Sequence, residues 1–148
     1  MDKSILETKI KGINRAHLVG VAILIVLAIA STLTGEEYTY TANTGATIAK
    51  SLLMIFTFVN IPLIWWLYDK NVKNKELSEE SRQENLLKWS CIRILFWFTN
   101  TIMCIFLFNF DGDRSIFDLG VIAFIIYAFA AHANAKDIEI KQQDTIEN

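Results

Sequence analysis

Residues 16–34 read AHLVGVAILIVLAIASTLT, a run that contains no Asp, Glu, Lys or Arg. About 20 residues of α-helix cover about 30 Å, which is the thickness of the hydrocarbon core of a bilayer. A helix on the surface of a soluble protein would show polar residues at nearly every turn, and this run does not. The stretch therefore predicts a transmembrane helix.

Three more stretches have the same character. Residues 51–68 and 94–110 carry no charged side chain, and residues 115–135 carry only Asp118. The sequence therefore predicts an all-α fold, an integral membrane four-helix bundle in which a single transmembrane domain covers residues 16–135. Its four helices are expected at residues 16–34, 47–68, 86–110 and 115–135. Residues 1–15 are expected to form an N-terminal segment and residues 136–148 a polar tail.

The basic residues predict the orientation, because Lys and Arg concentrate in cytoplasmic loops. Eleven of the chain's 14 basic residues fall outside the helices on one side: Lys3, Lys9, Lys11, Arg15, Lys70, Lys73, Lys75, Arg82, Lys88, Lys136 and Lys141. The other side has only Lys50 and Arg114. Both termini and the loop 69–85 are therefore expected in the cytoplasm, with loops 35–46 and 111–114 outside the plasma (inner) membrane.

Local signals refine this topology. Aromatic side chains that favour the membrane interface fall at the expected cytoplasmic edge: Trp65, Trp66, Tyr68 and Trp89. The spacing of Ser81 and Glu84 is that of a capping box, which predicts that the third helix starts there in water. An alternative for the first helix is a secretory signal cleaved before Ser31, since small residues precede that position.

Polar residues inside a membrane are the first place to look for function, because each is costly without a partner. Asn60, Pro62, Arg93 and Asn100 form a candidate polar seam between the second and third helices. Interhelical hydrogen bonding between the two asparagines is the favoured interpretation, with Pro62 breaking the helix beside them. Arg93 could extend to the headgroups as an anchor, or it could join this seam.

Four ionisable positions are further candidates. His17 and His132 fall at similar depth, and a pair of histidines can clamp a haem or a metal. No carboxylate or cysteine cluster accompanies them, so interfacial hydrogen bonding is favoured and no cofactor or metal is predicted. Lys50 and Asp118 are expected to pair at the outer ends of their helices. The two cysteines, Cys91 and Cys104, are expected to be buried thiols.

No catalytic residues are predicted, because the sequence has no phosphate-binding glycine loop, no Ser/His/Asp arrangement and no zinc-protease helix. The formal net charge of −2 gives no electrostatic case for a nucleic-acid partner. Small residues at Gly12, Ala16 and Gly20 are spaced so that another helix could approach closely. The expected partners are therefore the lipid bilayer and other membrane proteins or further copies of the chain.

Four segments together resemble a known family. They are NRAHLVG (14–20), IPLIWWL (61–67), ESRQENLL (80–87) and AFAAHANA (128–135). The family consists of small bacterial four-helix membrane proteins of unknown function, grouped distantly with a chloroplast inner-envelope protein-import component. The resemblance implies a four-helix membrane fold and implies no catalytic residues.

The function expected from these observations is that of a non-enzymatic accessory subunit, which acts through helix–helix contacts and its cytoplasmic loop. One alternative is an oligomeric transporter or channel subunit. Another is an immunity protein against a membrane-active toxin.

Overall fold

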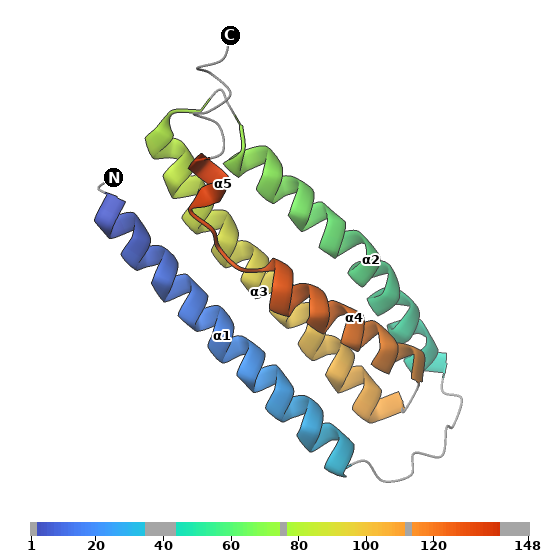
Figure 1. Ribbon diagram of the computed structural model, residues 1–148. Helices are drawn as coiled ribbons and strands as arrows, with labels where there is room; N and C mark the ends of the chain where they lie inside the picture. The colour runs from blue at the N-terminus through green and yellow to red at the C-terminus, as the bar shows by residue number, and fades with distance from the viewer. Residues whose placement is uncertain (1–2, 35–43, 75–76, 112–113, 140–148) are drawn as a thin grey trace.

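The computed structural model describes residues 3–34, 44–74, 77–111 and 114–139, and all regular structure in these residues is helical, as the sequence predicts. Figure 1 shows four long helices and one short one. They are α1 (Lys3–Thr34), α2 (Thr44–Val72), α3 (Glu79–Asp111), α4 (Arg114–Ala130) and α5 (Lys136–Glu139).

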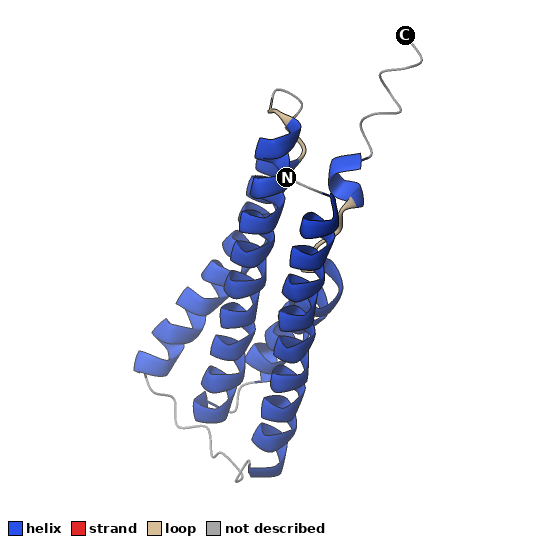
Figure 2. Ribbon diagram, turned by 90° about the vertical axis from the view of Figure 1, so that its left-hand side faces the viewer, coloured by secondary structure: helices blue, strands red, loops and turns tan. Residues whose placement is uncertain are grey.

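Helix α3 is the element against which the others pack. It contacts α1, α2, α4 and α5, and α4 also touches α1 and α2. Each long helix runs opposite to the one before it, so α1 begins and α4 ends at the same end of the molecule (Figures 1 and 2). We call this the terminal end, and we call the other one the loop end.

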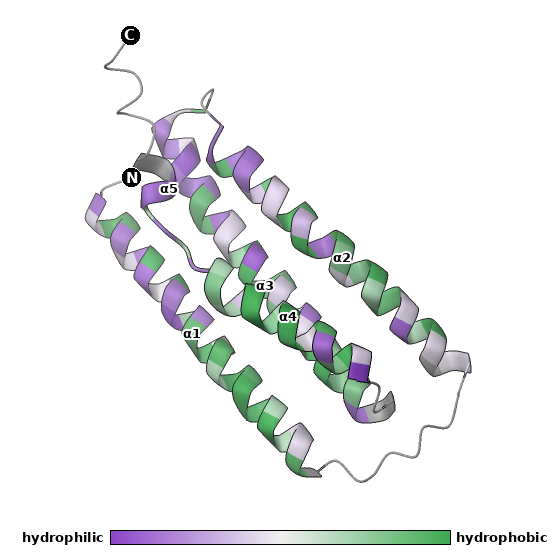
Figure 3. Ribbon diagram, turned by 45° about the vertical axis from the view of Figure 1, so that its right-hand side comes forward, coloured by the Kyte–Doolittle hydropathy of each residue, from purple (hydrophilic) through white to green (hydrophobic). Residues whose placement is uncertain are grey.

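Three of the long helices, α1, α2 and α3, are long and apolar enough to cross a membrane. Helix α4 is apolar but has 17 residues, or about 25 Å, which falls short of a hydrocarbon core of about 30 Å. Hydrophilic residues gather at the terminal end, whereas apolar residues dominate the rest of α1 (Figure 3). A membrane location is therefore plausible for this chain, with three helices able to span.

The helix bounds differ from the expected ones at several points. Helix α1 begins at Lys3, because Leu6 and Ile10 are buried in one cluster with residues of α2 and α3 and extend the helix well before residue 16. The cap of α3 is Ser78, whose Oγ accepts a hydrogen bond from the Ser81 amide at 3.3 Å, so Ser81 lies inside the helix rather than at its cap. The predicted external loops fall largely outside the described residues, as does most of the predicted tail.

Helix α4 is shorter than expected at its C-terminal end, because it stops at Ala130 although a helix to residue 135 was expected. Residues 131–135 leave the helix as an irregular segment before α5 begins. The reason is tertiary rather than local, because side chains of other helices bind the backbone of this segment, as described below.

Gly20 lies at a tight contact between α1 and α4. A Cβ at this position would overlap the hydroxyl of Tyr127 and would lie 3.4 Å from the ring of Phe98. Tyr127 cannot easily move away, because it is 1% exposed and its ring packs edge-on against His17 with centroids 4.8 Å apart. The absence of a side chain at Gly20 therefore allows α4 to seat against α1.

We expect Gly20→Ala to lower the free energy of unfolding by about 1–3 kcal/mol, as overpacking of a filled core does. Adding Tyr127→Phe should restore part of the loss, because it removes the overlapping oxygen. Denaturant titration in detergent micelles measures both effects.

The matched control is Gly12→Ala, since nothing lies within 4 Å of a Cβ at that position. It should leave stability unchanged or raise it by up to about 1 kcal/mol through helix propensity. Equal stabilities for the two glycine variants would contradict the packing argument.

Candidate functional site

The irregular segment that follows α4 is bound by side chains from α1 and α3. Asn14 of α1 makes two hydrogen bonds to one residue: its Nδ2 donates to the carbonyl of Ala133, and its Oδ1 accepts from the Ala133 amide, both at 2.9 Å. A carboxamide side chain thus pairs with a backbone amide as a neighbouring strand would. This pairing satisfies the amide and the carbonyl of a buried residue that lies outside any helix and so has no helical partner.

Arg93 of α3 binds the same segment from the other side. Its Nη2 donates to the carbonyl of His132 at 2.8 Å and to that of Ala131 at 3.3 Å. The side chain is 5% exposed, and within the described residues it makes no ion pair. Its charge instead faces carbonyl oxygens at the C-terminal end of α4, where the helix dipole favours a cation.

Aromatic rings cover the rest of the guanidinium. Its carbon lies 3.9 Å from the centroid of the Tyr68 ring and 5.8 Å from that of Trp97, which places it within range of cation–π attraction. The Tyr68 hydroxyl donates to Oδ2 of Asp137 at 2.7 Å and so ties α2 to α5. Arg93 therefore lies where α2, α3 and the end of α4 meet, a position that neither sequence-based interpretation of this residue included.

His17 completes the cluster from α1. Its Nε2 lies 2.9 Å from the carbonyl of Tyr127 and therefore carries the proton of that hydrogen bond. The Tyr127 hydroxyl donates in return to the carbonyl of His17 at 3.4 Å. We call the side chains of Asn14, His17, Tyr68 and Arg93 the α4 clamp.

A second group of polar side chains lies between α2 and α3. Thr57 donates to the carbonyl of Leu53 at 2.8 Å and lies 3.0 Å from Oδ1 of Asn100. Three buried side-chain nitrogens near this interface are among those with no hydrogen-bond partner within the described part of the chain: Asn60 Nδ2, Trp97 Nε1 and Asn100 Nδ2. This row, which we call the α2–α3 donor row, offers N–H groups without matching acceptors.

The structure brings some predicted site residues together and separates others. Asn60 and Asn100 are both buried, but the expected bond between them is wrong, because the Nδ2 of each has no partner in the described residues. The Oδ1 of Asn100 instead accepts a hydrogen bond from Thr57. Pro62 is exposed on α2, which continues through it without a break. A proline keeps a helical φ, and membrane helices tolerate the one backbone bond it removes.

The four ionisable candidates also separate. His17 is buried in the α4 clamp, whereas His132 is exposed, with Nε2 3.4 Å from Nδ2 of Asn14. Asp118 is exposed and does not pair with Lys50 in the part of the chain that the structure describes. Among those residues, no group of three or more His, Cys, Asp or Glu side chains is placed to hold a metal ion.

Sequence analysis did not single out Asn14, Thr57 or Tyr127. Asn14 precedes His17 by three residues and so shares its helix face, a spacing that signals a common polar partner. The signal for Tyr127 is its hydroxyl within an otherwise apolar run. Nothing local marks Thr57, because a membrane threonine can bond to its own helix, as this one also does.

Comparison of the chain with protein-family models, with curated proteins and with solved structures finds no match. The family resemblance drawn from the sequence therefore stays a prediction. We argue function below from the side chains just described.

We expect Asn14→Leu to free the segment after α4, because it removes both bonds to Ala133 and leaves a buried donor and acceptor unpaired. Each unpaired group costs about 1–3 kcal/mol, so amide exchange at residues 131–135 should accelerate by at least about tenfold. Hydrogen–deuterium exchange with mass spectrometry measures this directly.

Asn71→Leu is the matched control, because the Asn71 side chain bonds only to the carbonyl of Leu67 in its own helix. It should leave exchange at residues 131–135 unchanged. Equal exchange in the Asn14→Leu and wild-type proteins would show that Asn14 does not hold this segment.

Proposed function

We propose that this chain is a four-helix bundle of the plasma (inner) membrane with both termini in the cytoplasm. It acts as a non-enzymatic accessory subunit that holds a helix of another membrane protein. The basic residues favour this orientation, since those of the described chain lie mostly at the terminal end.

The α4 clamp supports a fourth crossing of the membrane. Helix α4 covers about 25 Å, and the irregular residues 131–135 add up to about 3.3 Å each. Irregular backbone at membrane depth is tolerated only where protein satisfies its polar groups. Asn14 and Arg93 supply partners for this segment, and His17 supplies one for the last turn of α4. On this proposal, α4 and the segment after it together reach across a bilayer.

The observation that carries the accessory role is a groove between α1 and α3 of about 450 Å³. One turn of a helix about 10 Å across occupies on the order of 400 Å³, so a partner helix can lie against this groove. Gly12 and Ala16 line its α1 side, and Cys91 and Leu95 line its α3 side. Small residues let helices pack closely in lipid, where the hydrophobic effect does not drive association.

Cys91 provides a probe in this groove. The expectation that both thiols are buried is wrong for Cys91, which is exposed, and confirmed for Cys104. Helix α3 turns these two side chains to different faces, so Cys91 points to the groove while Cys104 packs with Leu53 and Leu119.

We expect a photo-crosslinker attached to Cys91 in native membranes to yield one discrete adduct with another membrane protein. Gly12→Leu should remove the adduct, because it fills the groove at a position where no other side chain of this protein interferes. Mass spectrometry of the purified adduct identifies the partner segment.

Cys104 gives the matched control, since the same reagent on a Cys91→Ser protein has no access to the groove. A diffuse set of adducts that Gly12→Leu leaves unchanged would contradict the accessory role. An adduct with a second copy of the chain would assign the groove to self-association.

The α2–α3 donor row favours a second candidate, a transporter or channel subunit. Asn60, Trp97 and Asn100 present N–H groups without acceptors in the part of the chain that the structure describes. Such groups suit a small anion that passes between the helices. One four-helix unit encloses little room, so this role requires an oligomer.

For this candidate we expect chloride efflux from proteoliposomes above that of protein-free vesicles, measured with a chloride electrode. Asn60→Leu and Asn100→Leu should each abolish the excess, because each removes a buried donor. Asp118→Asn should not change it, since Asp118 is exposed on α4. Efflux equal to that of protein-free vesicles would exclude this candidate.

A further inference from the structure

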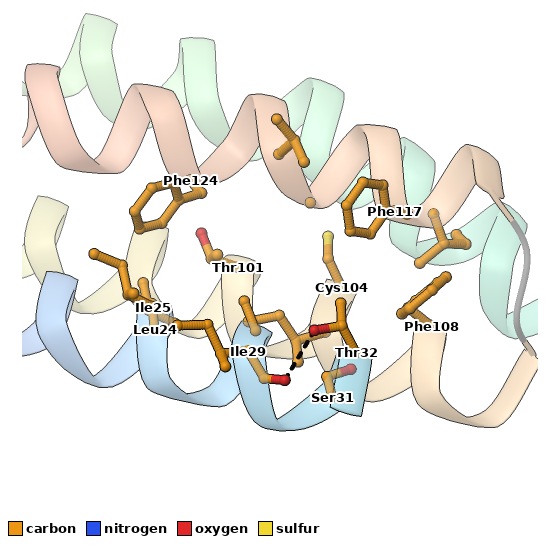
Figure 4. Close-up of a pocket in the computed structure, with 15 residues that line it drawn as sticks. Leu24, Ile25, Ile29, Ser31, Thr32, Thr101, Cys104, Phe108, Phe117 and Phe124 are labelled. Carbon is orange, nitrogen blue, oxygen red and sulfur yellow. Dashed lines mark hydrogen bonds between the residues drawn. The ribbon is translucent and has the colours of Figure 1, made fainter. Parts of the chain in front are cut away.

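Helices α1, α3 and α4 line a partly open cavity of about 210 Å³ toward the loop end of the molecule (Figure 4). Leu24, Ile25 and Ile29 of α1 face Phe117 and Phe124 of α4 across it, and Thr101 and Cys104 of α3 lie between them. The cavity begins where the close contact at Gly20 and Tyr127 ends. Bulky side chains on both helices then hold α1 and α4 apart.

The lining has almost no polar group that would need a hydrogen-bond partner in a bound molecule. Only three hydroxyl side chains reach the cavity, and each is already bonded within the protein. Ser31 donates to Oδ1 of Asn109 at 2.6 Å, Thr32 to the carbonyl of Ile29 at 2.8 Å, and Thr101 to the carbonyl of Trp97 at 2.9 Å. All other lining residues are apolar. An apolar cavity of this kind stays free of water and takes an apolar ligand.

The size of the cavity restricts the ligand further. A cavity of about 150 Å³ is enough for a benzene molecule, so this one has room for more than a ring of that size. It is smaller than one turn of a helix with side chains, which occupies on the order of 400 Å³. A helix of a partner or of a second copy therefore does not fit, whereas a narrow hydrocarbon chain does.

The position of the cavity indicates which molecules could supply such a hydrocarbon chain. Its α1 and α3 walls belong to helices that are long and apolar enough to span a membrane. Around such helices, the narrow hydrocarbon chains at hand are those of the bilayer lipids. We propose that this cavity binds one acyl chain of a membrane phospholipid as a fixed part of the protein.

The inference rests on the membrane placement proposed above but not on the partner groove. The lipid proposal and the partner proposal can be tested independently. The groove lies on the Cys91 side of α3, and its occupancy is measured by protein adducts rather than by lipid adducts. Loss of the Cys91 adduct would leave lipid binding untouched.

The test uses the full chain in phosphatidylcholine vesicles that contain a trace of phospholipid with a diazirine on its acyl chain. Photolysis and peptide mass spectrometry should place adducts at residues 24–32 of α1 and 117–124 of α4. Ala28→Phe fills the cavity from α1 and should lower these adducts by roughly tenfold, the factor that two buried methylene groups contribute.

Two further variants keep the test decisive. Val121→Trp fills the cavity from α4 and should give the same loss if Ala28→Phe fails to fold. Ala22→Phe places the same ring on an exposed face of α1 outside the lining and should leave the adducts unchanged.

Adducts spread evenly over all exposed helix faces and unaffected by Ala28→Phe would overturn the proposal, because they would show surrounding lipid only. Absence of lipid adducts from residues 24–32 and 117–124 would also overturn it, because the cavity would then hold no acyl chain.

Discussion

The polar groups of the backbone must be satisfied inside the protein wherever the chain lies in a membrane. Helices α1, α2 and α3 meet this requirement with their own hydrogen bonds, but α4 stops at Ala130 and leaves carbonyls that its own helix cannot pair. Arg93 is the side chain that pairs backbone carbonyls just beyond the end of α4. It bonds the carbonyls of Ala131 and His132 in the irregular segment that follows α4, stacks on Tyr68 and lies on the central helix.

The charge-free runs made the long helices predictable, because a span of apolar residues has few other stable arrangements. The end of α4 was not predictable, since residues 131–135 contain three alanines and neither glycine nor proline. Local propensity there favours more helix. The helix ends because Asn14 and Arg93 bind its backbone, and both are distant in sequence.

The sequence predicted the members of the polar site in part, but it did not predict their partners. Asn60, Arg93 and Asn100 were recognised as costly in a membrane, and all three are buried. Their partners could not be assigned, because a single sequence gives helix faces but not the rotation of one helix against another. Tyr68 illustrates the limit: it is buried while Trp66 is exposed, since two residues turn a helix by about 200°.

The α4 clamp also has a consequence for biosynthesis. Asn14 and Ala133 are separated by 119 positions, so nearly the whole chain must be synthesised before they can meet. Until then the Arg93 side chain lacks the carbonyls of Ala131 and His132 that it binds in the finished fold. Assembly is thus completed by the segment after α4, because a chain that stops before residue 131 lacks the backbone groups that Asn14 and Arg93 bind.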